Sequence, residues 1–128
     1  MIILEEKVNF RSELSIIIAR NSEGQKQAFE PVVNLHQNGI LIKTIAKQQS
    51  SPQIADKARI IAFQIADGLN LEGLLTVEFF LDDAANLIVN EIAPRPHNSG
   101  HYSLECCNVS QFEQFIRAIC HLPLISVK

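Results

Sequence analysis

The sequence lacks several features that would assign the protein to a particular class. There is no excess of positive charge, since 11 basic side chains stand against 14 acidic ones and the formal charge is -3. A broad basic surface for nucleic acid or an anionic membrane is therefore excluded, and an anionic ligand must be bound by local groups. No apolar run approaches the roughly 20 residues of a membrane-spanning helix, and the N-terminus lacks a signal peptide's basic region and cleavage site. We expect a soluble, cytoplasmic protein with no nucleic-acid or membrane partner.

The sequence has only three cysteines and no internal repeat. Cys106 and Cys107 are adjacent and Cys120 is distant, so a fully paired disulfide framework is excluded and a reducing compartment is expected. No repeat, low-complexity tract or linker divides the 128 residues, a length typical of one domain with one core. We expect Cys120 to pack in that core.

The apolar stretches and turn signals predict an α+β fold. We expect strands at residues 2–8, 14–20, 28–35, 40–46, 74–81 and 87–93, with tight turns at 21–24 and 38–39. The clearest helix begins after an N-cap at Ser51 and ends near Gly68. A last helix follows Ser110, with an apolar stripe at Phe112, Phe115, Ile116 and Ile119. This order favours a mostly antiparallel sheet packed with helices.

Two acidic residues, Glu78 and Glu91, interrupt the apolar strands of the last predicted hairpin. An ionised carboxylate in an apolar sheet is costly unless it is paired or coordinates a cation. With a four-residue turn at 83–86, the two acids would lie directly opposite each other. Carboxylates without cysteine or histidine in the same strands favour magnesium or manganese over zinc. Alternatively, each acid lies on a solvated strand face or at a strand end.

A polar loop follows the hairpin, and two prolines stiffen it. Pro94 and Pro96 flank Arg95, whose guanidinium suits a phosphate or a carboxylate, and a stiff loop loses less entropy when it binds an oxyanion. His97 could donate to that oxyanion or act as an acid or base. The alternative is a surface loop in which histidines cap backbone groups.

A zinc site is a further alternative for this region. His97 and His101 are four residues apart, and with Cys106 and Cys107 they could share a metal. Pro96 argues against a helix that would bring the histidines together, and adjacent cysteines are poorly spaced for zinc. We therefore favour the oxyanion-binding interpretation.

The same segment resembles carboxyaminoimidazole ribonucleotide synthetase, the ATPase subunit of phosphoribosylaminoimidazole carboxylase. The similar stretches are Val77-Glu78-Phe79-Phe80, then Asn90-Glu91-Ile92-Ala93 thirteen residues further on, and Pro94-Arg95-Pro96-His97-Asn98-Ser99-Gly100-His101. Similarity extends over nearly the whole chain. It implies an ATP-grasp fold and a carbon-nitrogen ligase that uses ATP and bicarbonate to carboxylate aminoimidazole ribonucleotide in de novo purine biosynthesis.

The resemblance also implies roles for individual residues. The nucleotide-binding set is Glu5, Glu6, Lys7 and Val8 at the adenine, Glu13 at the ribose, and His36, Asn90 and Glu91. The implied metal ligands are Glu78 and Glu91. The implied catalytic residues, facing the ribonucleotide and the activated bicarbonate, are Arg95, His97 and Asn98. ATP and magnesium are the implied cofactors, with manganese as an alternative.

The chain departs from the full family pattern in extent. Residues 1–128 match the C-terminal subdomain of the ATP-grasp domain, whereas the family's N-terminal domain, glycine-rich phosphate-loop subdomain and small C-terminal domain are absent. We therefore expect a fragment without turnover of its own. Lys7 replaces an apolar or small hinge residue, and Ala93 stands where many ATP-grasp enzymes have a metal-binding asparagine, which leaves the number of metal ions open.

Three points about assembly and function stay open from the sequence. The chain could be an isolated nucleotide-binding module without turnover. It could instead belong to another ATP-grasp ligase, such as the formate-dependent glycinamide ribonucleotide formyltransferase, although Asn98-Ser99 favours the carboxylating enzyme. A homodimer like that of the full-length relatives is a further expectation.

Overall fold

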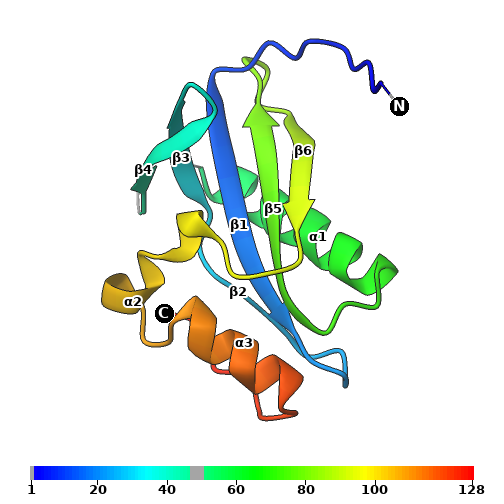
Figure 1. Ribbon diagram of the computed structural model, residues 1–128, viewed down its shortest axis with the longest axis vertical. Coiled ribbons are helices and arrows are strands. Elements are labelled where there is room, and N and C mark those ends of the chain that lie inside the picture. Colours follow the sequence, from blue (N-terminus) through cyan, green and yellow to red (C-terminus); the bar gives the residue numbers. More distant parts are fainter. Residues whose placement is uncertain (1, 47–50) are drawn as a thin grey trace.

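The computed structural model describes residues 2–46 and 51–128, which form one sheet with helices against both faces (Figure 1). The strands are β1 (Ser12–Arg20), β2 (Lys26–Ala28), β3 (Val32–Gln37), β4 (Ile40–Ile45), β5 (Gly73–Leu81) and β6 (Leu87–Ala93). The helices are α1 (Pro52–Gly68), α2 (Ser103–Cys106) and α3 (Gln111–Ile119), with a 3-10 turn at Asn98–Gly100. The predicted α+β class with a mostly antiparallel sheet is confirmed, because every strand pair among these residues is antiparallel.

The two central strands are far apart in the sequence. The order across the sheet is β4-β3-β1-β5-β6, with β2 paired to β1. Strands β1 and β5 pair along their full length, from Ser12 opposite Leu81 to Arg20 opposite Gly73. Helix α1 connects β4 to β5 across the sheet, and it begins as predicted, with the Ser51 hydroxyl accepting a hydrogen bond from the Ile54 amide.

The sheet has one fully covered face and one partly covered face. Leu14, Ile16 and Ile18 of β1 pack with Ala58 and Ala62 of α1 in the larger core cluster. Burying a side chain such as Ile16 contributes about 1.5–3 kcal/mol. The opposite face carries a smaller cluster under α3, which lies at the Gly73 end of the central strands (Figure 1). Among the residues that the structure describes, no helix therefore lies over the other end of that face.

Helix α3 buries only part of the predicted apolar stripe. Phe112, Ile116 and Ile119 are exposed, whereas the buried residues are Gln111, Gln114 and Ala118. The prediction holds for Phe115, which packs against the smaller core cluster beside Gly73. The rest of the buried side of α3 faces irregular backbone, and the two glutamines bond to that backbone. The core position expected for Cys120 is also wrong, since this residue caps the exposed end of α3.

Two strand predictions need correction. Residues 2–10 contain no strand, because the backbone first joins the ladder at Arg11, whose amide donates to the Leu81 carbonyl. The strand predicted at 28–35 is divided between β2 and β3. Pro31 cannot donate to a ladder, and Phe29 turns into the core with 1% of its surface exposed. The turn at Asn38 and Gly39 is confirmed, with φ values of 53° and 75°.

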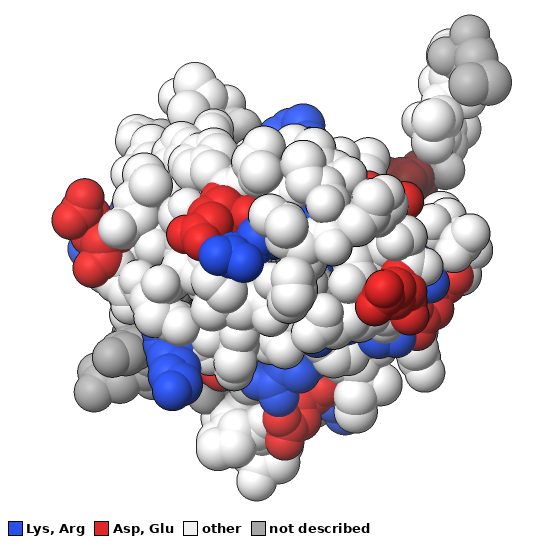
Figure 2. All heavy atoms as spheres, turned by 90° about the horizontal axis from the view of Figure 1, so that it is seen from below, with Lys and Arg blue, Asp and Glu red and all other residues white. Residues whose placement is uncertain are grey.

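The surface agrees with the near balance of charges. On the face seen in Figure 2, acidic and basic side chains are interspersed and neither sign forms a broad patch. Within the described residues, no helix has the length and apolar character needed to cross a membrane.

Candidate functional site

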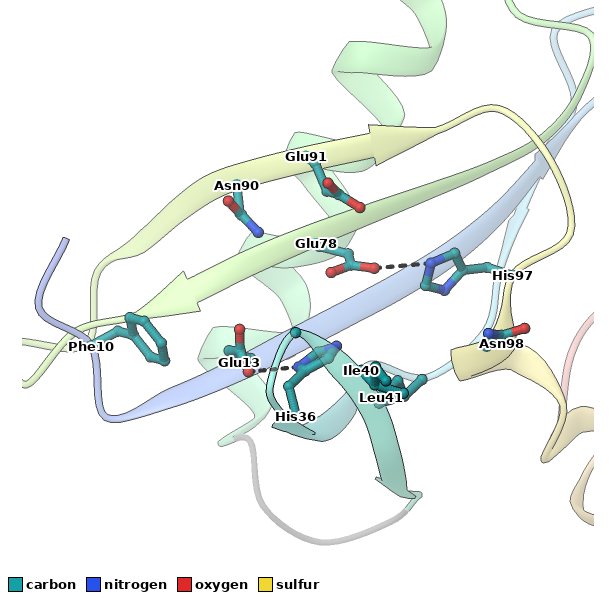
Figure 3. Close-up of a pocket in the computed structure, with 11 residues that line it drawn as sticks. Phe10, Glu13, His36, Ile40, Leu41, Glu78, Asn90, Glu91, His97 and Asn98 are labelled. Atoms are coloured by element: carbon teal, nitrogen blue, oxygen red, sulfur yellow. Dashed lines mark hydrogen bonds and ion pairs between the residues drawn. The ribbon is translucent and has the colours of Figure 1, made fainter. Parts of the chain in front are cut away.

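A hollow of about 660 Å³ lies over the end of the sheet that α3 leaves uncovered (Figure 3). Its lining includes seven residues of the predicted site, namely Glu13, His36, Glu78, Asn90, Glu91, His97 and Asn98. Phe10, Gly39, Ile40 and Leu41 complete the lining. Strands β1, β3, β5 and β6 thus meet the loop after β6 at one place.

The two carboxylates of the hairpin lie opposite each other, as predicted, although the turn length and the strand register differ from the prediction. Glu78 of β5 lies directly opposite Glu91 of β6. The turn between Leu81 and Leu87 has one residue more than the predicted four-residue turn, and the register is shifted between Glu78 and Phe79 by a β-bulge. The extra residue in β6 compensates for the longer turn, so Glu91 reaches the position opposite Glu78.

The bulge also explains why two consecutive residues face the hollow. In a regular strand Asn90 and Glu91 would point to opposite faces. Val89 pairs with Phe79 and Glu91 pairs with Glu78, which leaves Asn90 as the extra residue of the bulge. Bulges re-aim side chains in this way, often beside functional sites. Both Asn90 and Glu91 consequently line the hollow (Figure 3).

Glu78 is hydrogen-bonded to His97. The His97 Nε2 and Glu78 Oε1 atoms are 3.0 Å apart, and the two side chains are 12% and 14% exposed. His97 Nδ1 accepts from the Ser99 amide at 3.3 Å, so the proton donated to Glu78 is carried by Nε2. The hydrogen bond from His97 lowers the pKa of Glu78, and electrostatic interactions with His97, His36 and Arg95 act in the same direction, while burial opposes this. Glu78 is therefore ionised at neutral pH.

A second acid-histidine pair lies across the hollow. Glu13 of β1 and His36 of β3 are joined by a contact of 2.6 Å between Oε2 and Nδ1 (Figure 3). Beside this pair, Asn34 is buried and its amide donates to the Ser15 hydroxyl at 2.8 Å. The sequence patterns did not indicate Ser15 or Asn34. Polar residues within two apolar strands were the available signal.

Helix α3 holds the loop after β6 in place through Gln111. The Gln111 carboxamide bonds to both the backbone amide and the backbone carbonyl of His97. Gly100 packs so closely that a Cβ there would lie 2.3 Å from Ile17 Cδ1. Neither Gln111 nor Gly100 was singled out as a site residue from the sequence, because a glutamine at the start of an amphipathic helix is typical of a solvated position.

The remaining predicted residues lie outside this hollow. Glu5, Glu6 and Val8 line a smaller neighbouring hollow of about 220 Å³, which shares Asn90 with the larger one. Lys7 is exposed and lines neither hollow. Arg95 is also exposed, and its guanidinium donates to the Pro96 carbonyl at 3.0 Å.

The arrangement of ligand atoms excludes the zinc alternative. Among residues 2–46 and 51–128, no group of three or more histidine, cysteine or acidic side chains could hold a metal ion. His97 is paired with Glu78, away from any cluster with His101, Cys106 and Cys107. Two facing carboxylates fit magnesium, which binds through one or two carboxylates and completes its coordination with phosphate oxygens and water.

Comparison with known proteins identifies related sequences and folds. The ATP-grasp domain family matches residues 1–112. The N5-carboxyaminoimidazole ribonucleotide synthase of Bacillus subtilis is 50% identical over 122 residues, which are 95% of this chain and 32% of that protein. A crystal structure of N5-carboxyaminoimidazole ribonucleotide synthetase in complex with ADP has a TM-score of 0.94 and 42% identity, over 97% of this chain and 33% of that one.

A second structure resembles the chain at lower identity. It is the synthase of Aspergillus clavatus in complex with ADP and 5-aminoimidazole ribonucleotide, with a TM-score of 0.85 and 30% identity. The match covers 91% of this chain and 31% of that one. The chain spans about a third of the length of the synthases that it matches.

Proposed function

This chain belongs to the ATP-grasp domain family, and from that premise we propose that it forms part of a ligase of purine biosynthesis. The ligase would use ATP and bicarbonate to carboxylate aminoimidazole ribonucleotide, and this chain would supply nucleotide, magnesium and substrate contacts. The names of its relatives support this reaction. The observation that carries the proposal is the placement of Glu78 opposite Glu91 in a hollow that also contains both acid-histidine pairs.

The two adjoining hollows suggest how a nucleotide would lie. Glu5, Glu6 and Val8 line the smaller hollow, and Asn90 is common to both. A nucleotide along this path would place adenine against the backbone of residues 5–8 and its phosphates near Asn90. Glu13 would accept hydrogen bonds from ribose hydroxyls, with His36 holding its carboxylate in place. The relative that was crystallised with ADP supports nucleotide binding.

Glu78 and Glu91 would hold the magnesium or manganese ion. Their facing carboxylates provide hard oxygen ligands, and the lowered pKa of Glu78 keeps its ligand atoms deprotonated. A carboxylate has about four lone-pair sites, so Glu78 can accept from His97 and still bind a cation. When bound, the metal would neutralise charge on the phosphate oxygens.

The loop after β6 would face the ribonucleotide and the activated bicarbonate. His97 and Asn98 line the same hollow, and Arg95 is exposed near Glu78. These groups would position the two reacting molecules and stabilise negative charge that develops between them, which is the main contribution of such donors. The Aspergillus clavatus relative, which holds ADP together with 5-aminoimidazole ribonucleotide, supports binding of the ribonucleotide.

A chimaeric enzyme tests the proposal. The matching part of the Bacillus subtilis synthase would be replaced by this chain, and ATP hydrolysis would be measured with and without aminoimidazole ribonucleotide and bicarbonate. We expect hydrolysis that requires both substrates. Glu91→Gln should lower it on the order of a hundredfold, as for loss of a preorganised electrostatic group, whereas Glu105→Gln on α2 should leave it unchanged. Hydrolysis that ignores aminoimidazole ribonucleotide, or that responds to glycinamide ribonucleotide instead, would refute the proposal.

We also propose a homodimer for the complete enzyme, as expected from the resemblance. Sedimentation analysis of the chimaera tests it directly. A monomer at the protein concentration of the activity assay would exclude a dimer as the active form.

A further inference from the structure

Gln111 is a buried polar residue that lies behind the site. It is the first residue of α3, and none of its surface is exposed. A carboxamide removed from water needs partners for its donor and acceptor groups, because an unpaired one is costly. The hydrogen-bond partners of the Gln111 carboxamide therefore indicate its role.

Both partners of the Gln111 side chain belong to His97. Gln111 Oε1 accepts from the His97 amide at 2.9 Å, and Gln111 Nε2 donates to the His97 carbonyl at 2.8 Å. The carboxamide thus pairs with the main chain much as a neighbouring strand would. The proline-flanked segment that ends at His97 is thereby connected directly to the first turn of α3.

The imidazole of His97 is held as well as its backbone. Nδ1 accepts from the Ser99 amide, and Nε2–H donates to Glu78. Fixing the backbone on one side and the ring on the other leaves the ring little freedom to rotate. The direction of the Nε2–H bond is consequently set by the position of α3.

Close packing keeps the Gln111 carboxamide in this orientation. A Cβ on Gly100 would lie 2.6 Å from Gln111 Oε1, so the loop backbone packs directly against the carboxamide. The Ser103 hydroxyl accepts from the Gln111 amide at 2.9 Å and donates to the Gly100 carbonyl at 2.6 Å. The amide of the first helical residue is therefore also satisfied by the loop it supports.

We propose that Gln111 is a positioning residue, which orients His97 toward Glu78 and the hollow through its two bonds to the His97 backbone. The expected effect of Gln111 on turnover rests on the proposed function. The expected effect of Gln111 on the His97 imidazole does not, since the ring can be observed without any substrate. The competing explanation is that Gln111 only stabilises the fold.

Gln114 provides a matched control in the same helix. It is fully buried like Gln111, and its carboxamide also makes two backbone bonds. Its partners are the Ile125 carbonyl at 2.6 Å and the Ile125 amide at 3.0 Å. Gln114→Met and Gln111→Met therefore remove the same groups from equally buried positions, but only Gln111→Met releases His97.

The experiment observes the imidazole N–H proton of His97 by NMR in the full chain labelled with ¹⁵N-histidine. The chain has four histidines, and His97→Gln assigns the signal. We expect the Nε2–H proton to be protected from exchange with water in the parent chain and in Gln114→Met. In Gln111→Met its exchange should be about tenfold faster or more, the scale at which supporting residues affect a site.

A second variant keeps the test decisive if Gln111→Met fails to fold. Gln111→Asn keeps the carboxamide with its donor and acceptor, but its side chain is one methylene shorter, so it reaches the His97 amide and carbonyl less well. We expect an intermediate increase in exchange. Unchanged exchange in the Gln111 variants, or an equal increase in Gln114→Met, would overturn the positioning role.

Turnover of the chimaera separates this role from the proposed function. Gln111→Met should lower kcat about tenfold to a hundredfold, with a smaller change in the KM for ATP, and Gln114→Met should change neither. A kcat equal to that of the parent chimaera would overturn the role in catalysis. A parent chimaera without substrate-dependent hydrolysis would refute the proposed function, while the NMR result would still decide whether Gln111 orients His97.

Discussion

Replacing Glu78 by glutamine should destabilise the chain by about 1 kcal/mol at neutral pH. The substitution keeps the size and an oxygen acceptor for His97 Nε2–H, so one hydrogen bond remains but its charge is lost. A hydrogen bond to a charged group contributes about 1.5–3 kcal/mol and a neutral one about 0.5–1.5 kcal/mol, which sets the difference. Because the two side chains are only 14% and 12% exposed, solvent screening reduces this difference little.

The pH dependence of that difference follows from the lowered pKa of Glu78. A carboxyl group whose pKa is lower in the folded chain than its ordinary value of 4.5 stabilises the fold above 4.5. This contribution is lost as the pH falls through the folded-state pKa. The parent chain and Glu78→Gln should therefore differ in unfolding free energy at neutral pH and converge in acid. Urea denaturation at a series of pH values measures both.

Glu113→Gln is the control for this prediction. Glu113 pairs with Arg117 on the surface of α3 at 2.9 Å, and its side chain is 48% exposed. Such a pair four residues apart on a helix is worth only about 0.3–0.5 kcal/mol. A loss in Glu78→Gln no larger than in Glu113→Gln, or one that persists unchanged in acid, would refute the reasoning from the His97 bond.

Four further predictions follow from the same structure. Arg95→Ala in the chimaera should lower turnover more than ATP affinity, and equal losses would assign Arg95 to the nucleotide instead. Deleting Asn90 should leave Glu78 opposite Glu91 in a regular ladder and remove the Asn90 side chain from the hollow, so it should weaken binding of ADP with manganese about as much as Asn90→Ala does; a much larger loss for the deletion in calorimetry would contradict this. Tyr102 is the only tyrosine of the sequence, and burial raises its pKa, so phenolate absorbance should appear only at a pH well above 10. The stability that the neutral phenol gives to the fold should be lost as the pH rises through the folded-state pKa. Because the chain spans about a third of its relatives, it should not hydrolyse ATP in response to aminoimidazole ribonucleotide on its own, and turnover abolished by Glu91→Gln would show otherwise.

The features predicted well from the sequence are those with local causes. Ser51 caps α1 and Pro52 begins it, and both effects act within one helical turn. The turn at Asn38-Gly39 was predictable because these residues tolerate positive φ. Glu78 and Glu91 were recognisable because a carboxylate within an apolar strand requires an explanation. The pairing of β1 with β5 has no such signal, since it joins residues separated by four other elements.

The errors occur where a segment depends on its neighbours. Residues 2–8 have the composition of a strand, but a strand forms only where another backbone supplies its hydrogen bonds. The hairpin prediction placed Glu91 correctly for a wrong reason, because a longer turn and a bulge cancel each other in the register. Composition does not distinguish a regular hairpin with a four-residue turn from a hairpin with a longer turn and a bulge. Only the hairpin with the bulge turns Asn90 into the hollow.

The packing of α3 also differs from the prediction because it depends on a neighbouring segment, here the loop after β6. Hydrophobic periodicity assumes that a helix packs on apolar side chains. Part of the buried side of α3 instead meets His97 and Ile125, which lie outside the strands and whose backbone groups still need partners. Gln111 and Gln114 supply those partners, and a longer or more apolar side chain would leave the backbone groups unsatisfied. A loop whose backbone packs against a helix thus requires buried amides on that helix. A glutamine directly after a helix cap, downstream of a proline-broken strand, is therefore the sequence feature that would have indicated how His97 is held.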